Sequence, residues 1–146
     1  MIQVVLWAAV IAWAVIALFL TLQNGVDTAE TSGRITRCIC QLLKRCDISV
    51  SFPELHLTMR KSAHFLVFGV FGVLFEAAIL VSSQRASILR LYVPSLAICT
   101  VLAIVPEVIK LWIPGRHLEW NEVLLNVIGA YSGVLGTYLI WRLSAH

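Results

Sequence analysis

The sequence predicts an all-α, polytopic membrane protein with four transmembrane helices. Of its 146 residues, 60% are hydrophobic and 13% are charged, whereas soluble domains are about 45–50% apolar and about 25% charged. The mean hydropathy is +0.89, and four apolar runs are each long enough to cross about 30 Å of hydrocarbon. This composition excludes a soluble enzyme, a nucleic-acid-binding protein and a disordered chain. We expect a single domain over residues 1–146, with helices near residues 2–22, 62–82, 88–113 and 121–142.

The first apolar run, residues 2–22, is almost unbroken apart from Gln3. A cleaved signal peptide begins with basic residues and ends at a small-residue cleavage site. No basic residue precedes this run and no convincing cleavage site follows it. We therefore expect a retained transmembrane helix.

Polar residues mark the other three runs. The second run follows Arg60 and Lys61, the third contains two prolines, and the fourth carries Asn126 followed by glycines. Each run still has the length and apolar content of a transmembrane helix.

The first connection, residues 23–59, is the longest one. Its start, from Asn24 to Gly33, is rich in residues that favour turns and caps. Residues 34–46 then place apolar side chains at helical spacing, with basic residues between them. That pattern is typical of a short amphipathic helix in the membrane interface, and it also fits a solvent-facing helix packed on the bundle. Cys38, Cys40 and Cys46 lack a fourth ligand at zinc spacing, so we expect reduced thiols here.

Polar residues from three runs are predicted to meet on one side of the membrane. The starts of the second and fourth helices and the end of the third helix face the same side in a four-helix topology. A charge inside the bilayer costs about 2.5–3.5 kcal/mol, so such residues usually gather in the interior of a bundle. Glu76 is an exception, because it lies about 18 Å beyond His64 along its helix. The residues predicted to gather are Arg60, Lys61, His64, Glu107, Lys110, Arg116, Glu122 and Asn126.

Several of these residues also have a purely structural interpretation. Lys110 follows Glu107 by three residues, which fits a local ion pair. His64 could be a buried histidine that is hydrogen-bonded to Glu107. Arg60 and Lys61 could simply anchor their helix at the interface.

Arg116 follows a Pro-Gly turn. A guanidinium held by such a turn is well placed to bind a phosphate or a carboxylate. For this residue we favour a functional role over an anchoring one.

A stripe of small residues follows Asn126 on the last helix. Gly129, Gly133 and Gly136 recur at helical spacing, on the same face as Asn126. Small residues four positions apart let a second helix approach closely. These three glycines are therefore predicted to form a helix-packing surface.

Three motifs, in this order, resemble those of the VanZ-like family. The run Arg60-Lys61-x-x-His64-Phe65 is similar to that family's Lys-x-x-His-Phe signature. Residues 107–116 resemble its Glu-x-x-Gln-x-x-x-Pro-Gly-Arg segment, and residues 122–129 resemble its Asp-x-x-x-Asn-x-x-Gly segment. The resemblance extends over most of the chain. Two positions depart from the family pattern, because Lys110 stands in place of Gln and Glu122 in place of Asp.

The resemblance implies a multi-pass protein of the bacterial plasma membrane that lowers susceptibility to teicoplanin-type lipoglycopeptides. It also implies that the side carrying the motifs faces outward. The basic residues favour the cytoplasm for that side instead, because eight lie there and three on the other side. The eight are Arg34, Arg37, Lys44, Arg45, Arg60, Lys61, Lys110 and Arg116, and the three are Arg85, Arg90 and Arg142.

The function that we favour is non-catalytic binding. The cations Arg60, Lys61 and Arg116 would hold an anionic lipid headgroup or a lipid-linked cell-wall precursor. The expected partners are therefore membrane lipids, with a wall precursor or the lipoglycopeptide itself as further candidates, and no nucleic acid. The sequence leaves the oligomeric state open.

Two other classes of function stay open. A membrane-embedded enzyme could act on a lipid or lipid-phosphate substrate through His64, Glu107 and Glu122, either with a divalent metal or with Glu107 as base. The chain has no recognised metal spacing or nucleophile motif, so we expect no cofactor and no metal and lean away from an enzyme. Alternatively, the glycine stripe could join a larger wall-synthesis or transport complex.

Overall fold

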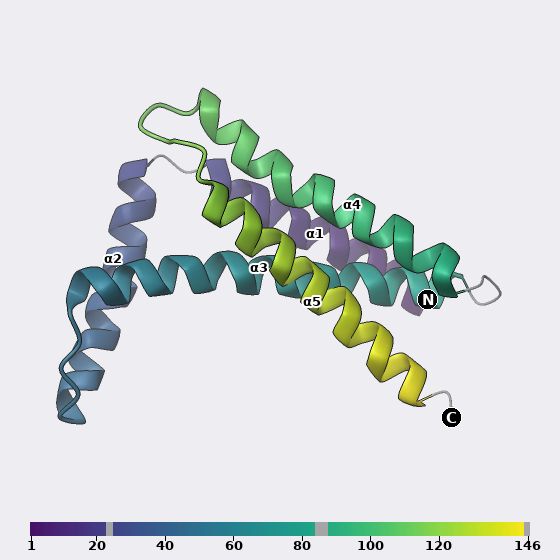
Figure 1. Ribbon diagram of the computed structural model, residues 1–146, viewed down its shortest axis with the longest axis horizontal. Helices are drawn as coiled ribbons and strands as arrows, with labels where there is room; N and C mark the ends of the chain where they lie inside the picture. Colours follow the sequence, from purple (N-terminus) through teal and green to yellow (C-terminus); the bar gives the residue numbers. More distant parts are fainter. Residues whose placement is uncertain (23–24, 84–87, 145–146) are drawn as a thin grey trace.

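A computed structural model of the chain describes residues 1–22, 25–83 and 88–144. The elements are α1 (Ile2–Leu22), α2 (Gly25–Arg45), α3 (Phe52–Ser82), α4 (Ile88–Ile109), the short 3-10 helix η1 (Lys110–Trp112) and α5 (Trp120–Ser144) (Figure 1). Helices α1, α3, α4 and α5 are long and apolar enough to cross a membrane. The predicted fold class, all-α with four transmembrane helices, is therefore confirmed. Asn24 and Arg85 lie outside the described residues.

Helix α3 begins at Phe52 rather than near residue 62. The sequence pattern marked only its apolar part, but the preceding residues contain no helix breaker after Pro53, which stands in the first turn where proline is tolerated. With 31 residues, α3 is about 46 Å long at helical rise. It therefore exceeds the hydrocarbon thickness of about 30 Å.

Helix α2 is also longer than predicted, because it begins at Gly25 instead of near residue 34. The segment up to Gly33, expected to form turns, is helical. In Figure 1, α2 crosses the N-terminal part of α3, and the hydroxyl oxygen of Thr36 lies 3.3 Å from Nδ1 of His56. The apolar side chains of Ile35 and Leu42 are exposed. The location of α2 in the membrane interface stays a prediction.

Helices α3 and α5 cross with their backbones in direct contact. A Cβ atom at Gly129 would overlap the carbonyl oxygen of Phe65, and one at Gly133 would overlap that of Gly69. Glycine is therefore required on α5 at both positions, because any side chain would push the helices apart. Gly136 does not share this contact, since a Cβ there would meet nothing within 4 Å. The two helices diverge beyond their crossing (Figure 1), which is why the predicted packing surface ends before Gly136.

Helix α1 packs against α3 and α4. The indole N–H of Trp7 donates to the hydroxyl of Ser82 at 3.0 Å, and that of Trp13 donates to the carbonyl oxygen of Val67 at 2.9 Å. The Trp7 ring also meets Phe75 edge to face, with ring centroids 5.9 Å apart. These contacts join α1 to the C-terminal half of α3.

The glycine contact gives a direct stability prediction. Replacing Gly133 by Ala is expected to destabilise the fold by about 1–3 kcal/mol, because the added methyl group overlaps the α3 backbone. Replacing Gly136 by Ala is the matched control, and it is expected to be neutral or stabilising by up to about 1 kcal/mol because alanine favours helix. Thermal unfolding in detergent micelles compares the two variants, and equal melting temperatures would contradict the observed crossing.

A buried charged cluster at one end of the bundle

A tight turn brings the end of α4 and the start of α5 side by side. The backbone N–H of Arg116 donates to the carbonyl oxygen of Ile113 at 3.1 Å. Between them Gly115 has a φ of 75°, which a type II turn requires at its third residue, and Pro114 fits the fixed φ of the second. The turn therefore reverses the chain directly after η1, so that α4 and η1 face the first turns of α5.

Lys110 lies at the centre of the cluster. Its ammonium group donates to Oε1 of Glu107 at 2.7 Å and to Oε2 of Glu122 at 2.6 Å. Lys110, Glu107 and Glu122 are each at most 3% exposed. The local ion pair expected from the spacing of Glu107 and Lys110 is therefore part of a larger network, in which one ammonium bridges two buried carboxylates from different helices.

Glu122 also connects α5 to α3. Nε of Arg60 donates to Oε1 of Glu122 at 2.7 Å. A second nitrogen of Arg60 forms an ion pair with Glu119, whose side chain is 49% exposed. Glu119 was not among the residues predicted from the sequence. Glu119 directly precedes α5, and its carbonyl oxygen accepts from the backbone N–H groups of Glu122 and Val123. Its position three residues before Glu122 is the signal that could have identified it.

His64 is held by Asn126 rather than by a hydrogen bond to Glu107. Nδ1 of His64 lies 3.0 Å from the amide oxygen of Asn126, and the amide nitrogen of Asn126 donates to the carbonyl oxygen of Ala103 and to Glu107. Because the amide nitrogen already has two acceptors, the amide oxygen must face His64, and Nδ1 must carry the donated proton. Glu107 is 3.9 Å away from this nitrogen.

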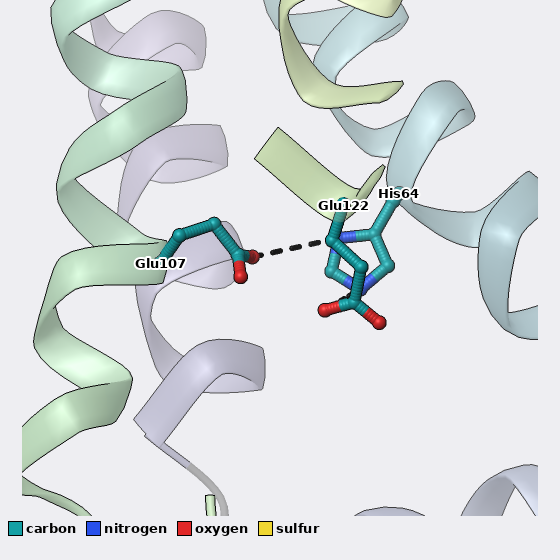
Figure 2. Close-up of side chains that lie close together, drawn as sticks. All are labelled: His64, Glu107 and Glu122. Carbon is teal, nitrogen blue, oxygen red and sulfur yellow. Dashed lines mark ion pairs between the residues drawn. The ribbon is translucent and has the colours of Figure 1, made fainter. Parts of the chain in front are cut away.

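The other ring nitrogen of His64, Nε2, lies 3.3 Å from Oε2 of Glu122. Figure 2 shows Glu107 extending from α4 toward this histidine and Glu122. The cluster therefore sets two permanent cations, Arg60 and Lys110, and the imidazole of His64 against three carboxylates. The carboxylates are those of Glu107, Glu119 and Glu122.

The structure joins six of the eight residues predicted to gather. Those six are Arg60, His64, Glu107, Lys110, Glu122 and Asn126. Lys61 is exposed beside Arg60, and Arg116 is half-buried in the turn before α5. Glu76, the predicted exception, is buried farther along α3, where it is hydrogen-bonded to Ser95 of α4.

Comparison with known protein families matches residues 6–142 to the VanZ/LLP1 family. The chain belongs to the VanZ/LLP1 family. The matched residues include the four membrane-spanning helices almost entirely and the whole charged cluster. Family membership confirms the resemblance seen in the three sequence motifs. Comparisons with curated proteins and with solved structures return no significant match.

The two carboxylate partners of Arg60 are expected to contribute very differently to the stability of this VanZ/LLP1 protein. Removing the buried carboxylate in Glu122→Ala weakens the pairing of both Arg60 and Lys110, so a loss of about 3–5 kcal/mol is expected. Glu119→Ala is the matched control, and its half-exposed carboxylate should contribute less than about 1 kcal/mol. Thermal unfolding in detergent measures both, and comparable losses would show that the buried network does not hold the helices together.

Proposed function

We propose that this VanZ/LLP1 protein lowers the susceptibility of a bacterium to teicoplanin-type lipoglycopeptides by binding an anionic lipid headgroup or a lipid-linked cell-wall precursor at the charged cluster. The protein would act in the plasma membrane. The observation that carries the proposal is the burial of Glu107, Lys110 and Glu122 in helices long and apolar enough to span a membrane. Ionisable residues at membrane depth are expensive to retain and usually mark a functional site.

The cluster divides into a buried part and an exposed part. Lys110 is enclosed and already donates to two carboxylates, so its role in the proposal is to position Glu122. The side chain of Arg60 is 36% exposed, and Lys61 next to it is also exposed. These two residues, with Arg116, are the cations that an anion arriving from the interface would reach.

Arg60 is suited to exchange one partner for a ligand. Its bond to the buried Glu122 fixes the guanidinium in place, whereas its second partner, Glu119, is half-exposed. An incoming phosphate could replace the Glu119 carboxylate on Arg60 without disturbing Glu122, because a guanidinium has five donors and binds phosphate in a bidentate manner.

A membrane-embedded enzyme acting on a lipid or lipid-phosphate substrate is the second candidate. It is favoured by one observation, that ligand atoms of His64, Glu107 and Glu122 all lie within 4.8 Å of one another. By contrast, the glycines of α5 offer little support for a scaffold role in a larger complex, because Gly129 and Gly133 are already occupied by the α3 backbone.

Expression in a susceptible Gram-positive host tests the proposed function. The wild-type protein is expected to raise the inhibitory concentration of teicoplanin selectively over that of vancomycin. Arg60→Ala, Arg116→Ala and Glu107→Gln should each lose this protection, because the first two remove cations of the site and the third weakens the pairing of Lys110.

Arg142→Ala is the matched control, since Arg142 is an exposed arginine in the last turn of α5, at the opposite end of that helix. It should protect as well as the wild type. Membrane abundance is measured by immunoblot for every variant. A well-expressed wild type that gives no protection would overturn the resistance role, and protection by Arg60→Ala and Arg116→Ala equal to that of the wild type would overturn the role of the cluster.

A further inference from the structure

We propose that His64, Glu107 and Glu122 form a binding site for a divalent transition metal, and that in this chain the ammonium group of Lys110 occupies the position of the metal. The inference concerns the buried side of the cluster. It goes beyond headgroup binding by Arg60, Lys61 and Arg116 and does not depend on it.

The three residues provide a suitable ligand set. One ring nitrogen and two carboxylate oxygens lie within 4.8 Å of one another, on three different helices (Figure 2). Zinc bound by three protein ligands uses such nitrogen and oxygen atoms at about 2.0–2.2 Å, which places neighbouring ligand atoms about 3.5 Å apart. The ligand atoms therefore need to approach one another by only about 1 Å to enclose a metal ion.

Lys110 provides a cation at this position. Its Nζ is 2.7 Å from the Glu107 carboxylate and 2.6 Å from Oε2 of Glu122, and the latter oxygen is also the one that faces Nε2 of His64 at 3.3 Å. The ammonium thus bridges the two carboxylates that a metal ion would bridge.

Two further features point to a metal ligand set rather than to an ordinary ion pair. Nδ1 of His64 donates to the amide oxygen of Asn126, which directs Nε2 into the cluster, and a metal-ligating histidine usually has such a fixed second nitrogen. In addition, Oε2 of Glu107 is buried and has no hydrogen-bond partner among the described residues. This oxygen is a spare ligand atom in the cluster.

Charge also favours the exchange. The ammonium of Lys110 lies between the carboxylates of Glu107 and Glu122, and Arg60 pairs with Glu119 and with Glu122. Removing Lys110 leaves the two buried carboxylates less compensated, which is strongly unfavourable. A divalent metal would restore positive charge between them.

Metal binding by Lys110→Ala tests the inference. Wild type and variant are purified in detergent, stripped with chelator and titrated with Zn²⁺ by calorimetry. The variant is expected to bind one Zn²⁺ per chain at least about tenfold more tightly than the wild type, and to prefer Zn²⁺ to Mg²⁺ because of its imidazole ligand. Its melting temperature should rise with Zn²⁺, and bound Co²⁺ should give the visible absorption of a nitrogen- and oxygen-ligated site.

Lys61→Ala is the matched control, because it removes an exposed lysine from the same end of the bundle, and it should bind Zn²⁺ no better than the wild type. If Lys110→Ala does not yield folded protein, Lys110→Gln replaces it, since an amide can still donate to a carboxylate. The inference is overturned if the Lys110 variant binds Zn²⁺ no more tightly than the wild type. It is also overturned if the double variant Lys110→Ala, His64→Ala binds as tightly as Lys110→Ala.

Discussion

The carboxylate of Glu122 is the group on which the arrangement of the helices depends. It accepts hydrogen bonds from Arg60 of α3 and from Lys110 of η1, and it faces His64. A buried charge is strongly destabilising unless it is paired, so the ends of three helices must meet around this residue. The glycine crossing makes this possible, because Gly129 contacts the carbonyl oxygen of Phe65, the residue next to His64.

Packing and electrostatics therefore act together in this fold. The close approach of α3 and α5 brings His64 within hydrogen-bond distance of Asn126, one helical turn before Gly129. The tight turn at Gly115 returns the chain so that Lys110 reaches Glu122. Arg60 connects the two parts of the cluster, because it binds the buried Glu122 and its side chain remains partly exposed. The inner part is the one for which we propose a cation site, and the outer part is the one for which we propose anion binding.

The sequence predicted the features that depend on local pattern or simple topology. Apolar runs gave the four membrane helices, and the up-and-down topology placed His64, Glu107 and Glu122 at one end. The pattern could not give the start of α3 at Phe52, because apolar and polar residues alternate in its first turns and form no continuous apolar run. Three features depend on how the helices cross in the folded protein. They are the sharing of Lys110 between two carboxylates, the contact of Glu119 with Arg60 and the end of the glycine contact before Gly136. These are tertiary contacts, which helical spacing in the sequence does not predict.

The most direct test of whether the buried ion network holds the helices together is a double-mutant cycle of Lys110→Met and Glu122→Gln. The free energy of unfolding of each variant is measured by reversible unfolding in detergent without metal. Each single variant leaves the other charge less compensated, whereas the double variant removes both charges. We predict a coupling energy of about 1–3 kcal/mol, with the double variant clearly more stable than the sum of the single losses implies. Additive losses would show that Lys110 and Glu122 contribute independently and that the buried ion network does not hold the helices together.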